Sequence, residues 1–268
     1  MATSDSPLNI KGSIKGLRFY KMEGSDKTYV GEKGGANIEL IQKSPKFKKT
    51  RLAQNELKGR AMMAKLIRGA LGQWAITIVN RHLQLKLSGI LQQVQNMDNP
   101  ILTGKRSLLL SKCKEVLNQV PWHYLRSFGE IVMCPFSVVT SEDKKSVTVS
   151  FKGFNPKMHI KPSAGASHFQ FCLTIATVSD LQTIKRSKTY SQVTRSNRNT
   201  IAWKVSEWIP IDGPLMDELT LTATLNEKYI LNEDQTVIRN LVILFGKMTY
   251  QMTEIQRDRG SIAYLGAE

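Results

Sequence analysis

Residues 44–97 read SPKFKKTRLAQNELKGRAMMAKLIRGALGQWAITIVNRHLQLKLSGILQQVQNM, and the periodicity of this stretch governs the expected architecture. Apolar residues recur at intervals of three and four, which places them on one face of a helix. The stripe comprises Leu57, Ala61, Ala64, Ile67, Leu71, Trp74 and Ile78, and it continues through Leu83, Leu87, Ile90, Val94 and Met97. Arg51, Lys58 and Lys65, which are seven apart, lie on another face. The pattern predicts an amphipathic helix, or two in succession.

The ends of this helical region carry their own signals. Ser44-Pro45 is typical of a helix start, although Thr50 is an alternative cap. A break is expected near Gly72, because a glycine inside a helix costs about 1 kcal/mol relative to alanine. A shorter helix is predicted over about 104–120, where Pro121 stops it.

The N-terminal residues predict a small arm. Residues 1–8 are small and polar, and we expect them to be disordered. Alternation around 16–22, a turn, and the segment 27–30 predict a β-hairpin that ends at Gly34-Gly35. An isolated two-stranded hairpin is marginally stable, so it must lie against another element or another chain.

The period changes from helical to alternating after about residue 130. Segments 147–151, 169–175, 201–205 and 219–225 alternate apolar with polar residues, and 241–245 is a continuous apolar run. Several short strands with turns between them predict an antiparallel sandwich or open barrel. The polar, basic segment 185–199 predicts a long loop.

The expected fold class is therefore α+β, with three regions along the chain. They are an N-terminal β-hairpin arm over 1–43, a helical region over 44–128 and an antiparallel β-sandwich domain over 129–268. The length of 268 residues suits one large domain or two small ones.

Charge is distributed unevenly along the chain. The net charge is +16, and residues 1–150 carry 24 basic against 11 acidic residues. Residues 151–200 carry 8 against 1, whereas residues 201–268 carry 6 against 10. This asymmetry indicates either a polyanionic partner or head-to-tail contact between copies of the chain.

Cysteine usage and hydropathy bound the compartment. Three cysteines without CxxC spacing argue against a disulfide framework and a structural zinc site. No apolar run reaches the roughly 18 residues of a membrane span, and the first residues lack a secretory signal. We therefore expect a cytoplasmic protein without a membrane partner.

No motif of a known catalytic site is present. The segment 98–107 faintly resembles a phosphate-binding loop, but it lacks the first glycine, and Arg106 separates Lys105 from Ser107. The histidines are scattered, and His168 and Cys172, four apart in a strand, are poorly placed to share a metal. The sequence predicts no catalytic residue, no metal and no cofactor.

Two basic clusters are candidate contacts for nucleic acid, because lysine and arginine neutralise phosphates without reading sequence. Phe47 or Tyr190 could stack on a base. The candidate residues are Lys46, Lys48, Lys49, Arg51, Lys58, Arg60, Lys65, Lys185, Arg186 and Lys188.

The opening IKGSIKGLRFYK at 10–21, followed by Gly34-Gly35 and by SPKFKKTRLAQN at 44–55, resembles that of an uncharacterised protein family common in Bacteroidetes. Those proteins begin with a glycine-punctuated hairpin, continue into helices and end in β structure. The resemblance covers about the first 70 residues, and the rest only in outline. Small phage-like structural proteins have similar openings. The resemblance implies no activity and no catalytic residue.

Three hypotheses follow for the function. The first is a non-enzymatic structural or assembly protein that forms a homo-oligomer or a larger complex, such as a phage-like or mobile-element particle. Its predicted self-association residues are Leu17, Phe19, Tyr20 and Tyr29. The alternative is a basic nucleic-acid-associated protein, and the third is an enzyme with an unfamiliar site.

Overall fold

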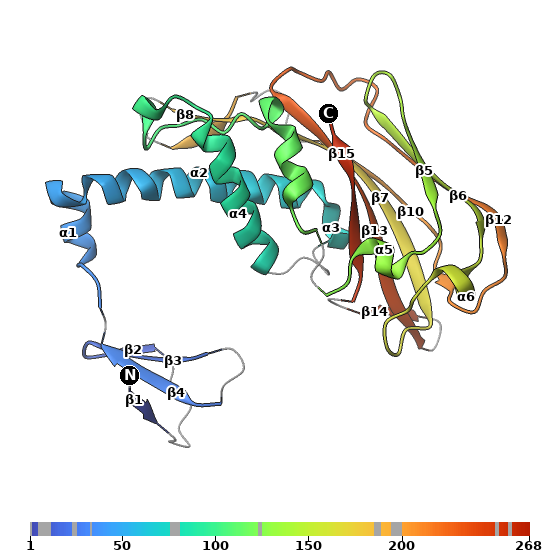
Figure 1. The fold of residues 1–268 in the computed structure, drawn as a ribbon, viewed down its shortest axis with the longest axis horizontal. Coiled ribbons are helices and arrows are strands. Elements are labelled where there is room, and N and C mark those ends of the chain that lie inside the picture. The colour runs from blue at the N-terminus through green and yellow to red at the C-terminus, as the bar shows by residue number, and fades with distance from the viewer. Residues whose placement is uncertain are drawn as a thin grey trace. The chain divides into compact units, whose positions relative to one another are not determined.

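The structure, a computed structural model, divides the chain into two compact units, Met1–Arg51 and Leu52–Glu268. We call the first the N-terminal unit and the second the body, and each is described by itself (Figure 1). The boundary at 51/52 differs from the expected ends of the arm and the helical region. The described residues are 2–4, 12–22, 26–32, 34–75, 81–122, 125–184, 189–193, 200–249, 252–256 and 259–268.

The N-terminal unit contains a four-stranded antiparallel sheet in the order β1-β4-β3-β2. The expected hairpin is confirmed as β3 (Leu17–Lys21) and β4 (Thr28–Glu32). Strands β1 (Ala2–Ser4) and β2 (Gly12–Ile14) extend it, so the expectation of disorder is wrong for residues 2–4. The turn between β2 and β3 has positive φ at Lys15 and Gly16, the tight two-residue turn that matches strand twist.

Two short helices follow this sheet. Helix α1 (Ile38–Lys43) begins at Asn37, whose side chain accepts a hydrogen bond from the backbone of Glu39. The 3-10 helix η1 (Pro45–Phe47) starts after Ser44, with proline at its first position as expected. Helix α2 (Lys48–Ala70) begins directly afterwards, so Thr50 lies inside it and is not its cap.

The long helical region is confirmed, including its break. Helix α2 ends before Gly72, where a φ of 77° leaves the helical conformation, and α3 (Gly72–Ala75) and α4 (Arg81–Asn96) follow. The expected apolar stripe is wrong in the first half of α2, because Leu57 and Ala61 are exposed. The buried residues of the whole helix are Glu56, Gly59, Met63, Ala64, Ile67 and Ala70.

The helix predicted over 104–120 is wrong. Leu108 instead forms an isolated bridge with Leu181, and two 3-10 helices follow, η3 (Leu110–Lys112) and η4 (Lys114–Gln119). The backbone N–H of Ser111 donates to the carboxylate of buried Asp180 at 2.9 Å, so it is not available for an α-helical bond. A further 3-10 helix, η2 (Pro100–Leu102), precedes this region.

The body contains two packed antiparallel sheets, which confirms the predicted sandwich. The larger sheet has the order β10-β7-β13-β14, with β11 paired to β7 and β15 to β13, and the smaller has the order β12-β6-β5. The larger comprises β7 (His168–Ser179), β10 (Ile201–Val205), β11 (Ile209–Pro210), β13 (Gln235–Thr249), β14 (Met252–Ile255) and β15 (Ser261–Ala267). The smaller comprises β5 (Phe136–Thr140), β6 (Ser146–Phe154) and β12 (Met216–Thr224).

Short elements complete the body. They are α5 (Phe128–Ile131), α6 (Pro156–His159) and a two-stranded ribbon of β8 (Leu181–Thr183) and β9 (Tyr190–Gln192). Strand β9 lies within the predicted loop 185–199, most of which is outside the described residues.

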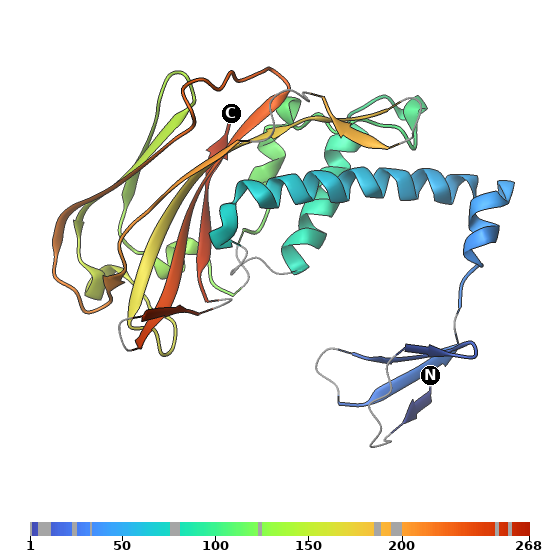
Figure 2. The same cartoon turned by 180° about the vertical axis from the view of Figure 1, so that it is seen from behind.

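The six-stranded sheet is the middle of three layers in the body. One hydrophobic core fills the space between this sheet and α2, α4 and η4, and a second fills the space between the two sheets. Figures 1 and 2 show the helices on one face of the sheet and the smaller sheet on the other. Because both faces are covered, nearly every residue of β7 is buried, including polar residues such as Thr174.

Candidate functional site

The small N-terminal sheet presents two chemically different faces. Residues that lie directly opposite each other in antiparallel strands share a face, and successive residues alternate between faces. The register pairs Phe19 with Val30, and it pairs Tyr20 with Tyr29. The four predicted self-association residues are therefore divided, with Leu17 and Phe19 on one face and Tyr20 and Tyr29 on the other.

The first of these faces, which we call the apolar face, carries Ile14, Leu17, Phe19 and Val30, and the same alternation places Lys21, Thr28 and Glu32 on it. The solvent-exposed fraction is 53% for Ile14 and 42% for Leu17. Among the described residues of the N-terminal unit, only the side chain of Thr28 is buried. Neither hydrophobic core includes a described residue of this unit.

The second face, which we call the aromatic face, consists of Arg18, Tyr20 and Tyr29. The two tyrosine rings are stacked, with centroids 5.8 Å apart and an interplanar angle of 24°. The guanidinium carbon of Arg18 lies over the Tyr20 ring, 5.9 Å from its centroid. A cation in this position is attracted by the negative face of the ring.

A shallow hollow of about 350 Å³ lies at the β2–β3 edge of the sheet, where residues of both faces line it. It is lined by Gly12, Ser13, Arg18, Phe19, Tyr20 and Lys21. Two of its lining side chains are cationic and two are aromatic, which is a composition suited to a planar, negatively charged ligand.

The predicted nucleic-acid residues are placed in different surroundings. Lys46, Lys48 and Lys49 are exposed in η1 and in the first turn of α2. Lys58 and Lys65 are exposed two helical turns apart on the outward side of α2. Lys185, Arg186 and Lys188 lie outside the described residues.

Arg51 and Arg60 differ from these lysines because both are half-buried. One terminal nitrogen of Arg51 donates to the carbonyl oxygens of Ile41 and Ser44, at 2.6 and 2.8 Å. These carbonyls belong to the last turn of α1 and to the residue that follows it, so Arg51 stabilises a helix C-terminus. Sequence reasoning assigned Arg51 to a phosphate and could not see these local acceptors.

Tyr190 is buried, so the expectation that it could stack on a base is wrong. Its ring lies against α2 at Gly59, where an added Cβ would approach the ring carbons to 2.5 Å. Its hydroxyl accepts from Gln95 at 3.0 Å and donates to the carbonyl of Arg106 at 2.8 Å. Burial raises the pKa of the Tyr190 hydroxyl.

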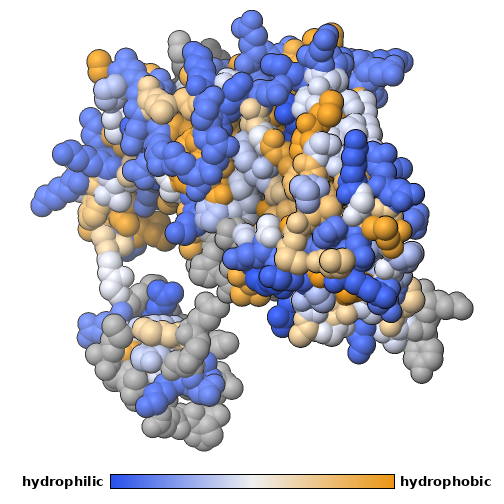
Figure 3. Space-filling view, turned by 45° about the vertical axis from the view of Figure 1, so that its right-hand side comes forward, coloured by the Kyte–Doolittle hydropathy of each residue, from blue (hydrophilic) through white to orange (hydrophobic). Residues whose placement is uncertain are grey.

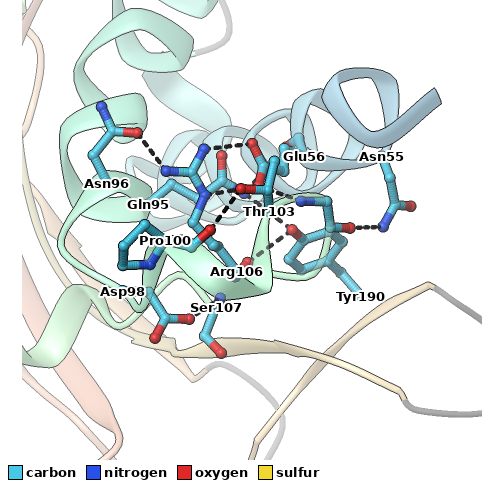
Figure 4. A network of polar contacts seen from close by, with 11 residues as sticks. Asn55, Glu56, Gln95, Asn96, Asp98, Pro100, Thr103, Arg106, Ser107 and Tyr190 are labelled. Atoms are coloured by element: carbon cyan, nitrogen blue, oxygen red, sulfur yellow. Dashed lines mark hydrogen bonds and ion pairs between the residues drawn. The ribbon is translucent and has the colours of Figure 1, made fainter. Parts of the chain in front are cut away.

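This tyrosine belongs to a buried polar network that sequence reasoning missed (Figure 4). Its centre is the pair of Glu56 and Arg106, joined by two parallel hydrogen bonds of 2.7 Å each. The Glu56 carboxylate also accepts from the backbone N–H of Gly104 at 2.7 Å, and Arg106 donates to Asn96 at 2.8 Å. The network ties α2 to the end of α4, to the segment 98–107 and to β9.

Glu56 and Arg106 each stabilise the charged form of the other. The hydrogen bonds from Arg106 lower the pKa of the Glu56 carboxyl, and the carboxylate in turn raises the pKa of Arg106. Arg106 is thus engaged with a protein carboxylate. The segment 98–107 is therefore arranged as a structural connection, and its resemblance to a phosphate loop has no counterpart in the geometry.

The remaining reactive groups form no constellation within the described ranges. No three His, Cys, Asp or Glu side chains there are grouped so that they could hold a metal ion. All three cysteines are free thiols, and burial raises the pKa of Cys172 to about 12. A thiol with this pKa is protonated near neutral pH and is a poor nucleophile.

Hydrophobic side chains also reach the surface of the body, between hydrophilic ones (Figure 3). The solvent-exposed fraction is at least 70% for three of them, Ile101, Ile230 and Met97. None of the described helices combines the length and the apolar character that crossing a bilayer requires.

Protein-family models, curated proteins and solved structures give no match to this chain.

Proposed function

We propose that this protein is a non-enzymatic assembly protein, and that the apolar face of its N-terminal sheet docks on the body of a second copy of the same chain. The observation that supports this proposal is the exposure of Ile14 and Leu17 in a unit whose described residues belong to neither hydrophobic core. Full burial of an aliphatic or aromatic side chain of this size stabilises the buried state by about 1.5–3 kcal/mol relative to the exposed one. Docking the four apolar residues of this face would supply several kcal/mol that the isolated unit lacks.

Charge complementarity with one segment of the body, residues 201–268, favours a second copy as the occupant; the body as a whole carries 27 basic and 17 acidic residues. The N-terminal unit carries 11 basic and 5 acidic residues, whereas residues 201–268 carry 6 basic and 10 acidic residues. Asp217 and Glu218 of β12 and the nearby Leu215 are exposed, so the acidic region also offers apolar surface. A basic unit on an acidic region of the next copy is a heterologous contact, which closes into a ring or grows into a filament.

The mass of the protein in solution tests this proposal. We expect the wild type to exceed the monomer mass in light scattering at low ionic strength, and a Leu17→Asp/Phe19→Asp variant to be monomeric. An Ile101→Asp variant is the matched control, because it alters an apolar residue that is 88% exposed on the body. A monomeric wild type at high protein concentration and low salt would overturn the proposal.

A second candidate function is electrostatic contact with a polyanion, favoured by the five exposed lysines Lys46, Lys48, Lys49, Lys58 and Lys65. Such contact releases counterions, so its affinity falls steeply as salt increases. A Lys58→Gln/Lys65→Gln variant should bind duplex DNA more weakly and with a smaller salt slope. The absence of any salt-dependent affinity in the wild type would remove this candidate.

A further inference from the structure

We propose that the aromatic face of the N-terminal sheet binds single-stranded nucleic acid. Unpaired bases would stack with the planar groups of Arg18, Tyr20 and Tyr29, and phosphates would contact Arg18 and Lys21. This site is separate from the exposed lysines of η1 and α2. Its stacking groups lie on the opposite face from the proposed assembly surface, whereas Lys21, which also lines the hollow, is on the face of Phe19.

The arrangement of planar groups is the first argument. Tyr20 and Tyr29 come from neighbouring strands and are held opposite each other by the β3–β4 register. Their rings are stacked at 5.8 Å, and the Arg18 guanidinium lies 5.9 Å from the Tyr20 centroid. Aromatic rings and arginine planes are the groups on which proteins stack single-stranded bases.

The hollow beside these groups is the second argument. It takes up about 350 Å³ and is lined by residues of the exposed strand β2 and of strand β3. Arg18 and Lys21 both line it, so its rim is cationic next to the aromatic rings. A nucleotide presents the matching combination of a flat base and a phosphate about one sugar away.

Charge and base accessibility identify the ligand class. The unit has more than twice as many basic as acidic residues, which favours a polyanion over a neutral or cationic partner. In a duplex the bases are already stacked on each other and are not available to a protein ring. Stacking on this face therefore requires unpaired bases, whereas the exposed lysines make no such distinction.

Fluorescence anisotropy with the full chain and a labelled oligo(dT) strand tests this inference. We expect the single strand to bind more tightly than a duplex of the same length, with an affinity that falls as salt rises. Tyr29→Leu should weaken binding roughly 5- to 150-fold, the range corresponding to the loss of one base–aromatic stack. Tyr29→Phe keeps the ring and should retain binding.

Two further variants separate stacking from charge. Arg18→Gln should weaken binding more than Lys157→Gln, which removes one exposed positive charge from the body. Equal losses for these two variants, or equal affinities for Tyr29→Leu and Tyr29→Phe, would overturn the inference. Equal binding of single strand and duplex, tighter binding of polyglutamate, or no binding at low salt would overturn it as well. Loss of duplex binding in the Lys58→Gln/Lys65→Gln variant concerns the electrostatic candidate alone.

Discussion

The N-terminal unit and the body both contain antiparallel sheets, but they treat their apolar residues in opposite ways. In the body, Phe171 and its neighbours are completely buried between two sheets. In the N-terminal unit, Leu17 retains 42% exposure and belongs to neither core. Described residues of the body therefore share two buried cores, whereas those of the N-terminal sheet belong to neither, and we propose that this sheet is covered by a second copy.

The largest expected effect comes from breaking the core between the sheets. The ring of Phe171 lies 4.9 Å from that of Phe151 and 5.5 Å from that of Phe169, centroid to centroid. Phe171→Ala should lower the free energy of unfolding by about 3–5 kcal/mol, because it leaves a cavity that the surrounding rings cannot fill. Urea unfolding followed by circular dichroism measures this change.

The matched variant in the other unit is Phe19→Ala, which removes the same ring from the apolar face. It should alter the unfolding free energy of the body by less than about 0.5 kcal/mol, since Phe19 contributes to neither core. A loss comparable to that of Phe171→Ala would show that the contrast between the units is wrong.

The next effect concerns the partly buried ion pair of the body. Glu56→Gln leaves the guanidinium of Arg106 without its counter-charge and should cost about 2–3 kcal/mol near neutral pH. The folded-state pKa of Glu56 lies below its unfolded value of 4.5, so the stabilisation is present above that pH. It is lost as the pH falls through the folded-state pKa.

The difference in unfolding free energy between the wild type and Glu56→Gln should therefore shrink in acid. Thermal or urea unfolding at a series of pH values between neutral and acid measures it. Glu142→Gln is the control, because this exposed carboxyl should give no loss at any pH. A difference that stays constant down to the lowest pH would contradict the assignment of the pair.

A smaller effect is expected from two glycines of the same helix, α2. A Cβ on Gly59 would approach the ring of Tyr190 to 2.5 Å, whereas a Cβ on Gly69 meets no atom within 4 Å. Gly59→Ala should destabilise the body by about 1–3 kcal/mol through overpacking. Gly69→Ala should stabilise it by about 1 kcal/mol, because alanine favours the helix. Thermal unfolding of both variants checks this: the melting temperature should fall for Gly59→Ala and rise for Gly69→Ala, and two shifts of the same sign would contradict the expectation.

Local sequence patterns predicted the elements that local chemistry determines. Gly72 marked the break after α2, and the alternation around 147–151 and 201–205 located β6 and β10. The failures involve partners far away in the sequence. The backbone of Ser111 donates to Asp180, and 3-10 turns form there in place of the expected helix. Glu56 is paired with Arg106, fifty residues later in the sequence.

The candidate site was predicted in composition but not in geometry. The sequence grouped Leu17, Phe19, Tyr20 and Tyr29 as one surface, although strand alternation already divides Phe19 from Tyr20. The partners across the sheet follow from the β3–β4 register, which the alternation of these strands alone did not specify. Arg18 was not among the predicted residues, and its place over Tyr20 became visible only with that register.

The smallest expected effect tests the misassigned stripe of α2. The sequence placed Leu57 on the buried face, but its side chain retains 49% exposure, and the carboxylate of Glu56 occupies the interior instead. Leu57→Ser should change the unfolding free energy by no more than about 0.5 kcal/mol, whereas Ile67→Ala in the same helix should cost about 2–5 kcal/mol. Chemical denaturation of both variants measures the two changes. Similar losses would mean that α2 is rotated about its axis, and the ion pair of Glu56 with Arg106 could not then form. The apolar stripe was wrong here because the side chain of Glu56, paired with Arg106, occupies the core position that hydrophobicity alone assigns to Leu57.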